Sequence, residues 1–322
     1  MSKLFQSVDV ERESATRESY FVKEQRCEGA FCKKGPYWHL CTPGALTEIL
    51  FTDRLDYSYG MTLMGMCADT FSQIEIMTYT LMSNHIHVIY SGDSKWADPF
   101  LDVFRAKMQR YISNRGRTVD LRFFRGDPIP ISNLHSLRNE IVYTNRNGYV
   151  SNPSVTPYSY PWGAGQLFFL PSLQNLPSRC FNELSVHEKR KLCHSKKITY
   201  SNRLRVRDGM IVPESICDIS FGESLFRDAH HYFSLLTKNH EANSQIAKRL
   251  SDYIFMTDEE MYSVACMLCS KEYHVSRPLL LSPEGKITVA KRMHYDYHAS
   301  SGQIRRILKL SEALVRELFP GE

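Results

Sequence analysis

Two histidines flank one apolar residue in the segment LMSNHIHVIY, which spans residues 81–90. The composition of this segment favours a β-strand, in which side chains two positions apart point to the same face. His85 and His87 would then present two imidazoles about 7 Å apart along that face, close enough to bind one divalent ion. Such a pair is also common by chance, and two histidines with ordinary structural roles remain the alternative.

Tyr143 lies off the apolar stripe of a predicted helix that begins near Ser132 or Asn133 and ends by Gly148. At about 100° per residue, Leu134, Leu137 and Ile141 form that narrow stripe. Tyr143 is on nearly the opposite side of the helix. The residues grouped with it there are Asn139, Glu140 and Asn147. A tyrosine kept only for core packing would lie on the stripe, so Tyr143 is a candidate functional residue.

Length and composition indicate a globular chain. The 322 residues favour two domains, and 43% hydrophobic and 23% charged residues are ordinary values that argue against disorder. No apolar run approaches the roughly 18 residues of a membrane-spanning helix. Residues 1–34 mix acids and bases without a signal-peptide core. The nine cysteines are an odd, scattered set that suits reduced thiols, so we expect a cytoplasmic protein with no membrane partner.

Two groups of cysteines and histidines have spacing loosely compatible with zinc. The first contains Cys27, Cys32, His39 and Cys41, and the second contains Cys266, Cys269 and His274. The first group lacks the short paired spacing of zinc knuckles. The second lies in an amphipathic helical pattern, where thiols are expected as small core residues. Zinc binding is therefore the less favoured interpretation of both groups.

Positive charge is concentrated in two windows, although the net charge of +5 is mild. Residues 101–150 hold nine basic and four acidic residues, and residues 186–210 hold eight and two. Interleaved aromatic residues favour a groove for a nucleic acid over a merely solvated face, because rings stack on bases while cations hold phosphates. By charge alone, the candidates for backbone contacts are Arg105, Arg110, Arg115, Arg117, Arg122 and Arg125.

The apolar periodicity of the first half predicts alternating strands and helices. A further strand is expected in the basic connector that precedes the helix of Tyr143. The elements expected before it are a strand at 37–42, a helix from Thr52 to about Thr70, strands at 74–82 and 85–90, and a helix at 96–114. This order is that of a ferredoxin-like α+β unit, which we expect as an antiparallel sheet with helices on one face.

The second half is predicted to be mostly α-helical. Residues 153–177 are rich in Pro, Gly and aromatic residues, which indicates a packed extension and a domain junction. Helical patterns follow at 185–197 and 258–275. At 299–319, two short helices capped by Ser300 or Ser301 and joined at 309–311 would suit a helix-turn-helix, with Arg305 and Arg306 facing outward to contact DNA. An ordinary helical hairpin is the alternative.

Several motifs together resemble one known family. LMSNHIHVIY is similar to the Asn-His-hydrophobic-His motif of the REP-associated tyrosine transposases, which are single-tyrosine members of the HUH endonuclease superfamily. YWHLCTPG and ILFTDRLDY resemble the first strand and helix of that family, and LRNEIVYTNRNGYV resembles its tyrosine helix. The chain departs from the pattern at Ser83, Gly148 and Gly163. The resemblance divides the chain into an N-terminal extension (1–34), an HUH domain (35–165) and a helical C-terminal region (166–322).

The resemblance implies metal-dependent cleavage and rejoining of single-stranded or hairpin DNA, as a transposase or a domesticated relative. His85 and His87 would hold the metal and the Tyr143 phenol would attack the phosphate, giving a 5′-phosphotyrosine. Asn147 lies one turn beyond Tyr143 and would complete a site suited to Mg²⁺ or Mn²⁺, with Glu140 as a weaker candidate ligand.

Two alternatives stay open at this stage. A non-catalytic DNA-binding regulator would keep the fold and bind duplex DNA through residues 299–319. A metal-dependent phosphoesterase that uses activated water would not need Tyr143. The family resemblance also leaves open a homodimer, in which Tyr143 would act on the metal site of a partner.

Overall fold

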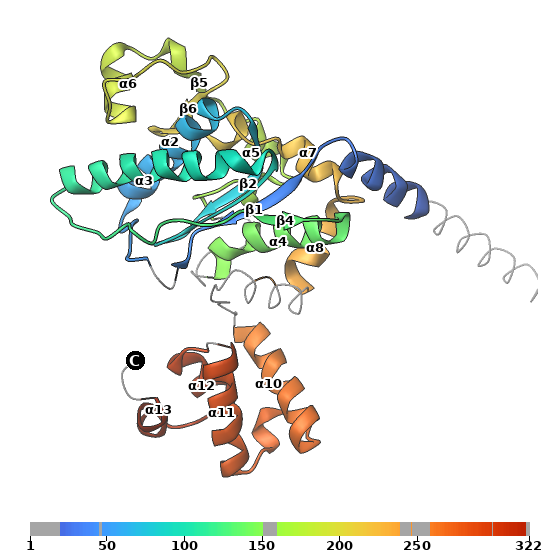
Figure 1. Cartoon of the computed structure of the whole chain (residues 1–322). Coiled ribbons are helices and arrows are strands. Elements are labelled where there is room, and N and C mark those ends of the chain that lie inside the picture. The colour runs from blue at the N-terminus through green and yellow to red at the C-terminus, as the bar shows by residue number, and fades with distance from the viewer. Residues whose placement is uncertain are drawn as a thin grey trace, which may run out of the picture. The chain divides into compact units, whose positions relative to one another are not determined.

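The computed structural model describes residues 20–44, 47–150, 160–238, 246, 258–297 and 299–319. The chain divides into two compact units (Figure 1). The first consists of residues 1–149 and 155–242, and the second of residues 150–154 and 243–322. Each unit has a hydrophobic core of its own.

A four-stranded antiparallel sheet forms the centre of the first unit. Its strands are ordered β2-β3-β1-β4, so β1 lies between β3 and β4 and pairs with both. This sheet confirms the α+β class and the predicted alternation of strands and helices. The elements are β1 (Tyr37–Cys41), α2 (Arg54–Thr70), β2 (Ile74–Leu81), β3 (Ile86–Gly92), α3 (Ala97–Asn114), β4 (Ile129–Ile131) and α4 (Leu134–Val150).

The helices cover both faces of this sheet, so the expectation of helices on one face was wrong. On β2, the Thr80 hydroxyl donates to the Thr144 carbonyl of α4 at 2.7 Å, whereas the Tyr79 hydroxyl contacts the Met61 sulfur of α2 at 3.4 Å. Figure 1 shows α2 and α3 on one side of the strands and α4 on the other. The physical reason is that side chains on both faces of β2 and β3 are buried. A sheet with helices on one face alone would leave the side chains of its other face in water.

Side-chain caps begin the helices where the sequence predicted them. Asp53 accepts a hydrogen bond from the Asp56 amide at 3.0 Å and caps α2. Asn133 accepts one from the Ser136 amide at 2.8 Å, just before α4. Helix α4 continues to Val150, beyond the predicted end at Gly148.

The first unit extends well past residue 165, where the sequence had placed a domain boundary. Gly163 forms a bridge to Thr80 and Cys217 forms one to Ile76, so the edge of β2 that does not pair with β3 meets later parts of the chain. Most of this later part consists of elements too short to show a periodicity. They are α5 (Pro171–Gln174), β5 (Arg179–Cys180), α6 (Val186–Cys193), β6 (Arg205–Arg207), β7 (Met210–Ile211), α7 (Ile219–Ser224) and α8 (Ala229–Lys238).

The described part of the second unit is helical, as predicted. Its core contains Met261, Leu268, Met293 and Leu308. Ser300 caps α12 in a capping box, and Lys309 forms the turn to the next helix with a φ of 54°. The two predicted short helices are therefore present, while their role stays a prediction. The helices are α10 (Asp258–Tyr273), α11 (Pro283–Tyr297), α12 (Ser301–Leu308) and α13 (Glu312–Leu318).

Candidate active site

The two histidines of the HxH motif converge at the start of β3. Nε2 of His85 lies 3.1 Å from Nε2 of His87, and the two rings meet edge to face. His85 is 5% exposed and His87 is fully buried. The expectation that both imidazoles point to one face is therefore confirmed.

Asn84 fixes the orientation of His85. Its amide nitrogen donates to the carbonyls of Gly44 and Thr47, at 2.7 and 3.0 Å. Both partners are acceptors, so the amide oxygen must be the atom that faces Nδ1 of His85 at 2.8 Å. Nδ1 of a neutral His85 therefore carries the proton and donates it to Asn84. The lone pair of His85 is then on Nε2.

A second chain of hydrogen bonds fixes His87, and it contains a histidine that the sequence did not assign to this site. His39 on β1 lies with Nδ1 at 2.7 Å from the Glu140 carboxylate and Nε2 at 3.0 Å from Nδ1 of His87. A carboxylate only accepts, so Nδ1 of a neutral His39 donates to Glu140 and Nε2 accepts from His87. Nδ1 of His87 therefore carries a proton, and its lone pair is also on Nε2.

With both rings neutral and in these tautomers, two nitrogen lone pairs would face each other across the 3.1 Å between the Nε2 atoms. Two such lone pairs repel unless a cation, either a proton or a metal ion, lies between them. Two donors at adjacent positions of a six-coordinate ion, with bonds of about 2.1 Å, are about 3.0 Å apart. The separation of the two Nε2 atoms thus fits a divalent metal.

Asn147 on α4 completes the arrangement. Its side-chain nitrogen lies 3.0 Å from Nε2 of His87, and a half-turn of the amide would place the oxygen there instead. In the described part of the chain, no three His, Cys, Asp or Glu side chains form a set that could hold a metal. A metal at this site would therefore have two imidazoles and the Asn147 amide as protein ligands, and non-protein ligands elsewhere. Glu140, the weaker candidate ligand, contacts His39 at 2.7 Å.

Tyr143 lies beside the histidine pair. Its ring is 5.5 Å from the His87 ring and 6.2 Å from the His39 ring, edge-on to both. Glu140, Tyr143 and Asn147 therefore share the face of α4 that meets the histidines, as the predicted helix geometry required. Asn139, which the sequence placed in the same group, contacts His135 at 3.1 Å. Tyr143 is 2% exposed, so the site is closed to bulk solvent.

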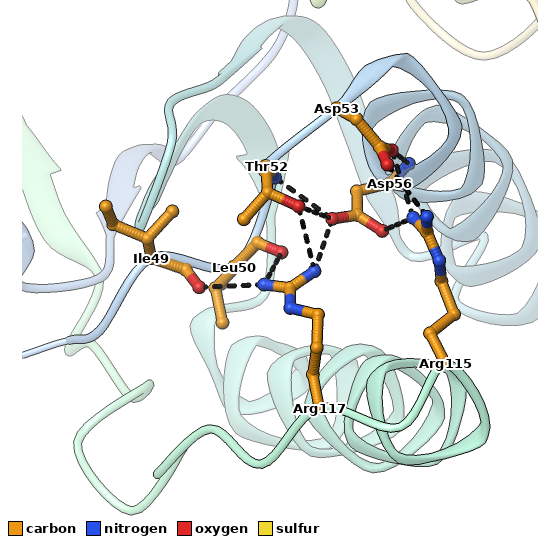
Figure 2. A network of polar contacts seen from close by, with 7 residues as sticks. All are labelled: Ile49, Leu50, Thr52, Asp53, Asp56, Arg115 and Arg117. Carbon is orange, nitrogen blue, oxygen red and sulfur yellow. Dashed lines mark hydrogen bonds and ion pairs between the residues drawn. The ribbon is translucent and has the colours of Figure 1, made fainter.

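Two of the six arginines proposed to contact DNA are bound by acidic side chains, and their contact with DNA stays a prediction. Arg115 binds Asp53 and Asp56, and Arg117 binds Asp56 and the Leu50 carbonyl (Figure 2). The Asp56 carboxylate is fully buried and also accepts from the Thr52 amide at 2.9 Å. The hydrogen bond from Arg115 holds the pKa of Asp53 well below its usual range. The buried carboxylate of Asp56 therefore accounts for the presence of both Arg115 and Arg117.

The other four arginines are on the surface to different degrees. Arg105 pairs with Asp102 and Arg122 pairs with Asp120, whereas Arg110 and Arg125 are exposed. In the second unit, Arg305 pairs with Glu312 of α13 at 2.9 Å, and Arg306 is exposed. Contact of these residues with DNA stays a prediction.

The alternative zinc groups do not come together among the described residues. Cys27 is buried in the helix at 20–31 and Cys32 is exposed at its end. Cys269 belongs to the core of the second unit, as expected. His39 and Cys41, from the first group, instead lie next to His87.

Comparisons with protein-family models, curated proteins and solved structures find no match to this chain. Among the described helices, none is both long and apolar enough to cross a membrane.

Proposed function

We propose that the chain is a metal-dependent enzyme that cleaves and rejoins single-stranded DNA, with Tyr143 as its nucleophile. The observation that carries the proposal is the pair of Nε2 atoms 3.1 Å apart, with Tyr143 and Asn147 beside them. The strand order β2-β3-β1-β4 supports it, because this is the order of the ferredoxin-like unit that the transposase resemblance implies.

The chemistry follows from the side chains present. A divalent ion held by His85, His87 and Asn147 would withdraw charge from a phosphate oxygen of the DNA. The Tyr143 oxygen attacks the phosphorus and forms a phosphotyrosine, while the bond to the 3′ oxygen breaks. The phenol proton ends on that oxygen, so the products are a 5′-phosphotyrosine and a free 3′-hydroxyl. The phosphoester bond is kept, and rejoining therefore needs no nucleotide cofactor.

Burial of the site adds one requirement. His87 is fully buried and Tyr143 is 2% exposed, so a phosphodiester reaches them only after the covering segments separate. The backbone of Gly44 is one such cover, because a Cβ built there would lie 2.7 Å from Nδ1 of His85. Opening of this cover precedes cleavage in the proposed cycle.

The test is incubation of the protein with Mn²⁺ and hairpin oligonucleotides labelled at either end, followed by a denaturing gel. Tyr143→Phe is the test variant. Tyr79→Phe is the matched control, because it removes a buried hydroxyl on the far side of the sheet, where it donates to the Met61 sulfur. We expect a label that migrates with the protein in the wild type and in Tyr79→Phe, and none in Tyr143→Phe. Cleavage that survives in Tyr143→Phe would show that water is the nucleophile and refute the tyrosine mechanism.

A non-catalytic regulator is the second candidate, favoured by the capped helices α12 and α13. Removal of the outward charges by Arg305→Ala and Arg306→Ala should abolish duplex binding by a regulator. The same change should spare the nicking of short oligonucleotides by an enzyme. Duplex binding that depends on these residues, without any cleavage, would favour the regulator.

A further inference from the structure

A large cavity in the first unit is separate from the histidine site. Its volume is about 930 Å³, within the usual range of roughly 300–1,000 Å³ for ligand pockets. It is lined by α2, the end of α3, α6 and the turn between β6 and β7. Helix α2 covers the face of the sheet opposite α4, so this cavity and Tyr143 lie on different faces.

The cavity joins the two basic windows of the sequence. Tyr111 and Arg115 come from the window at 101–150, whereas Lys191, His194 and Arg207 come from the window at 186–210. The two windows are separate in the sequence and meet at this cavity. The fold thus gathers cations from distant parts of the chain around one cavity.

Two cations at the rim of the cavity, one of them from outside these windows, are available to a ligand. Arg115, Arg179 and Arg207 are held by acidic partners. Arg54 and Lys191 are exposed, and no ion pair between described residues involves either of them. The rim therefore presents positive charge that suits an anion.

The walls suit a flat, partly polar group. The rings of Tyr59 and Tyr111 stack at 4.1 Å, and His194 meets both edge-on at 5.0 and 4.9 Å. Hydroxyls of Ser58 and Thr62 line the same space. The Thr62 hydroxyl already donates to the Ser58 carbonyl at 3.0 Å, which leaves the Ser58 hydroxyl as the group that the donors and acceptors on the edge of a nucleobase would meet.

We propose that this cavity binds a nucleotide unit, with the base against the aromatic wall and the phosphate at Arg54 and Lys191. The chemistry is shared by a free nucleotide and by a DNA strand. The second source follows from the proposed function and is favoured by the surroundings. Lys107 and Arg110 of α3 line an adjoining recess that shares Tyr59, Tyr111 and His194, so cations continue beyond the cavity as phosphates do along a strand.

The test measures binding of a fluorescent oligothymidine by the full chain, in chelator and with Tyr143→Phe as the background, so that no cleavage is involved. Lys191→Glu should weaken binding about tenfold, because a phosphate contact becomes a repulsion. Lys33→Glu is the charge-matched control, an exposed lysine outside the cavity, and should change binding by less than about twofold. Ser58→Trp fills the cavity without a change of charge and should also weaken binding about tenfold.

The outcomes distinguish a free nucleotide from a DNA strand as the ligand, and they test nucleotide binding separately from the tyrosine mechanism. Displacement of the oligothymidine by thymidine monophosphate would identify a site for a free nucleotide. Failure of the monophosphate to displace the oligothymidine would identify a site for a DNA strand. Both results support nucleotide binding. Wild-type affinity in Ser58→Trp, with an unchanged melting temperature, would overturn the inference even if Lys191→Glu binds weakly. Because cleavage is not measured, cavity-dependent binding stands even if the tyrosine mechanism fails.

Discussion

Replacement of Glu140 by glutamine tests whether the chain Glu140–His39–His87 prepares the metal site. The substitution keeps the size of the side chain and removes the negative charge that faces Nδ1 of His39 at 2.7 Å. Glu140 is 1% exposed and His39 is fully buried, so no solvent replaces that charge. The glutamine amide can also turn its nitrogen toward His39, which would reverse the proton positions and place a hydrogen on Nε2 of His87.

The expected magnitude follows from the position of Glu140. Loss of a group that orients a metal-binding histidine typically costs 10- to 100-fold in metal affinity, or about 1.4–2.7 kcal/mol. Glu140 acts through His39, one residue further from the metal, so we expect the lower limit, about tenfold. Removal of a direct ligand by His85→Gln should cost more than Glu140→Gln does.

The assay is a titration with Mn²⁺ that follows the electron paramagnetic resonance signal of the free ion. Glu214→Gln is the matched control, because it neutralises another largely buried carboxylate of the same unit, in the ion pair with Arg207. Melting temperatures show whether each variant is folded. A folded Glu140→Gln protein that binds Mn²⁺ within twofold of the wild type would refute the role of the relay. No Mn²⁺ binding by the wild type would refute the metal site itself.

Two further predictions concern stability. Asp56→Asn removes the fully buried charge shared by Arg115 and Arg117 and should lower the free energy of unfolding by about 3 kcal/mol, measured by urea denaturation; an unchanged urea midpoint would contradict the structural role of these arginines. Burial, with the nearby Arg227 as a smaller cause, lowers the pKa of His231 from 6.5 to about 4. The unfolded chain therefore binds the proton more readily, and stability should fall as the pH drops from about 6.5 toward 4. His231→Gln should reduce that fall, and an identical pH profile in this variant would contradict the prediction.

The sequence predicted the framework well because the two longest strands of the main sheet, β2 and β3, are long enough to show their pattern. Strand β2 and helices α2, α3 and α4 each carry an apolar repeat and a recognisable cap or break. The short strands β5 and β7 have two residues each, and no alternation can appear over that length. Strand composition did carry one missed signal. Apolar residues occupy both faces of β3, which favours helices on both sides of the sheet.

The domain boundary was placed too early because the glycines and prolines near residue 163 have a packing role. The backbone of Gly163 approaches β2 so closely that a Cβ there would lie 2.4 Å from the Tyr79 carbonyl oxygen. Glycine is thus required for pairing with the sheet, where the sequence suggested a junction. Local composition does not distinguish these two reasons for a glycine.

His39 was missed because its role depends on pairing between strands. In the register of β1 and β3, Cys41 lies opposite His87 and His39 opposite Ile89, so His39 is a diagonal neighbour of His87 on the same face. The spacing of residues along the sequence does not show which residues are neighbours across paired strands. The partner of His39 on α4 was visible, however, since Glu140 shares the polar helix face with Tyr143.

The arginines show why charge alone is a weak guide to a binding surface. Arg115 and Arg117 belong to a basic helix end and loop, yet their charge is balanced by Asp53 and Asp56 at the start of α2 (Figure 2). The two arginines stabilise the segment before α2. In that segment the Leu50 amide donates to the carbonyl of Ser83, which lies next to the histidine site. A cation with a buried acidic partner stabilises the fold, and only a cation without such a partner adds net attraction for a polyanion. By that criterion Lys191 and Arg54 are stronger candidates for DNA contact than Arg115 or Arg117.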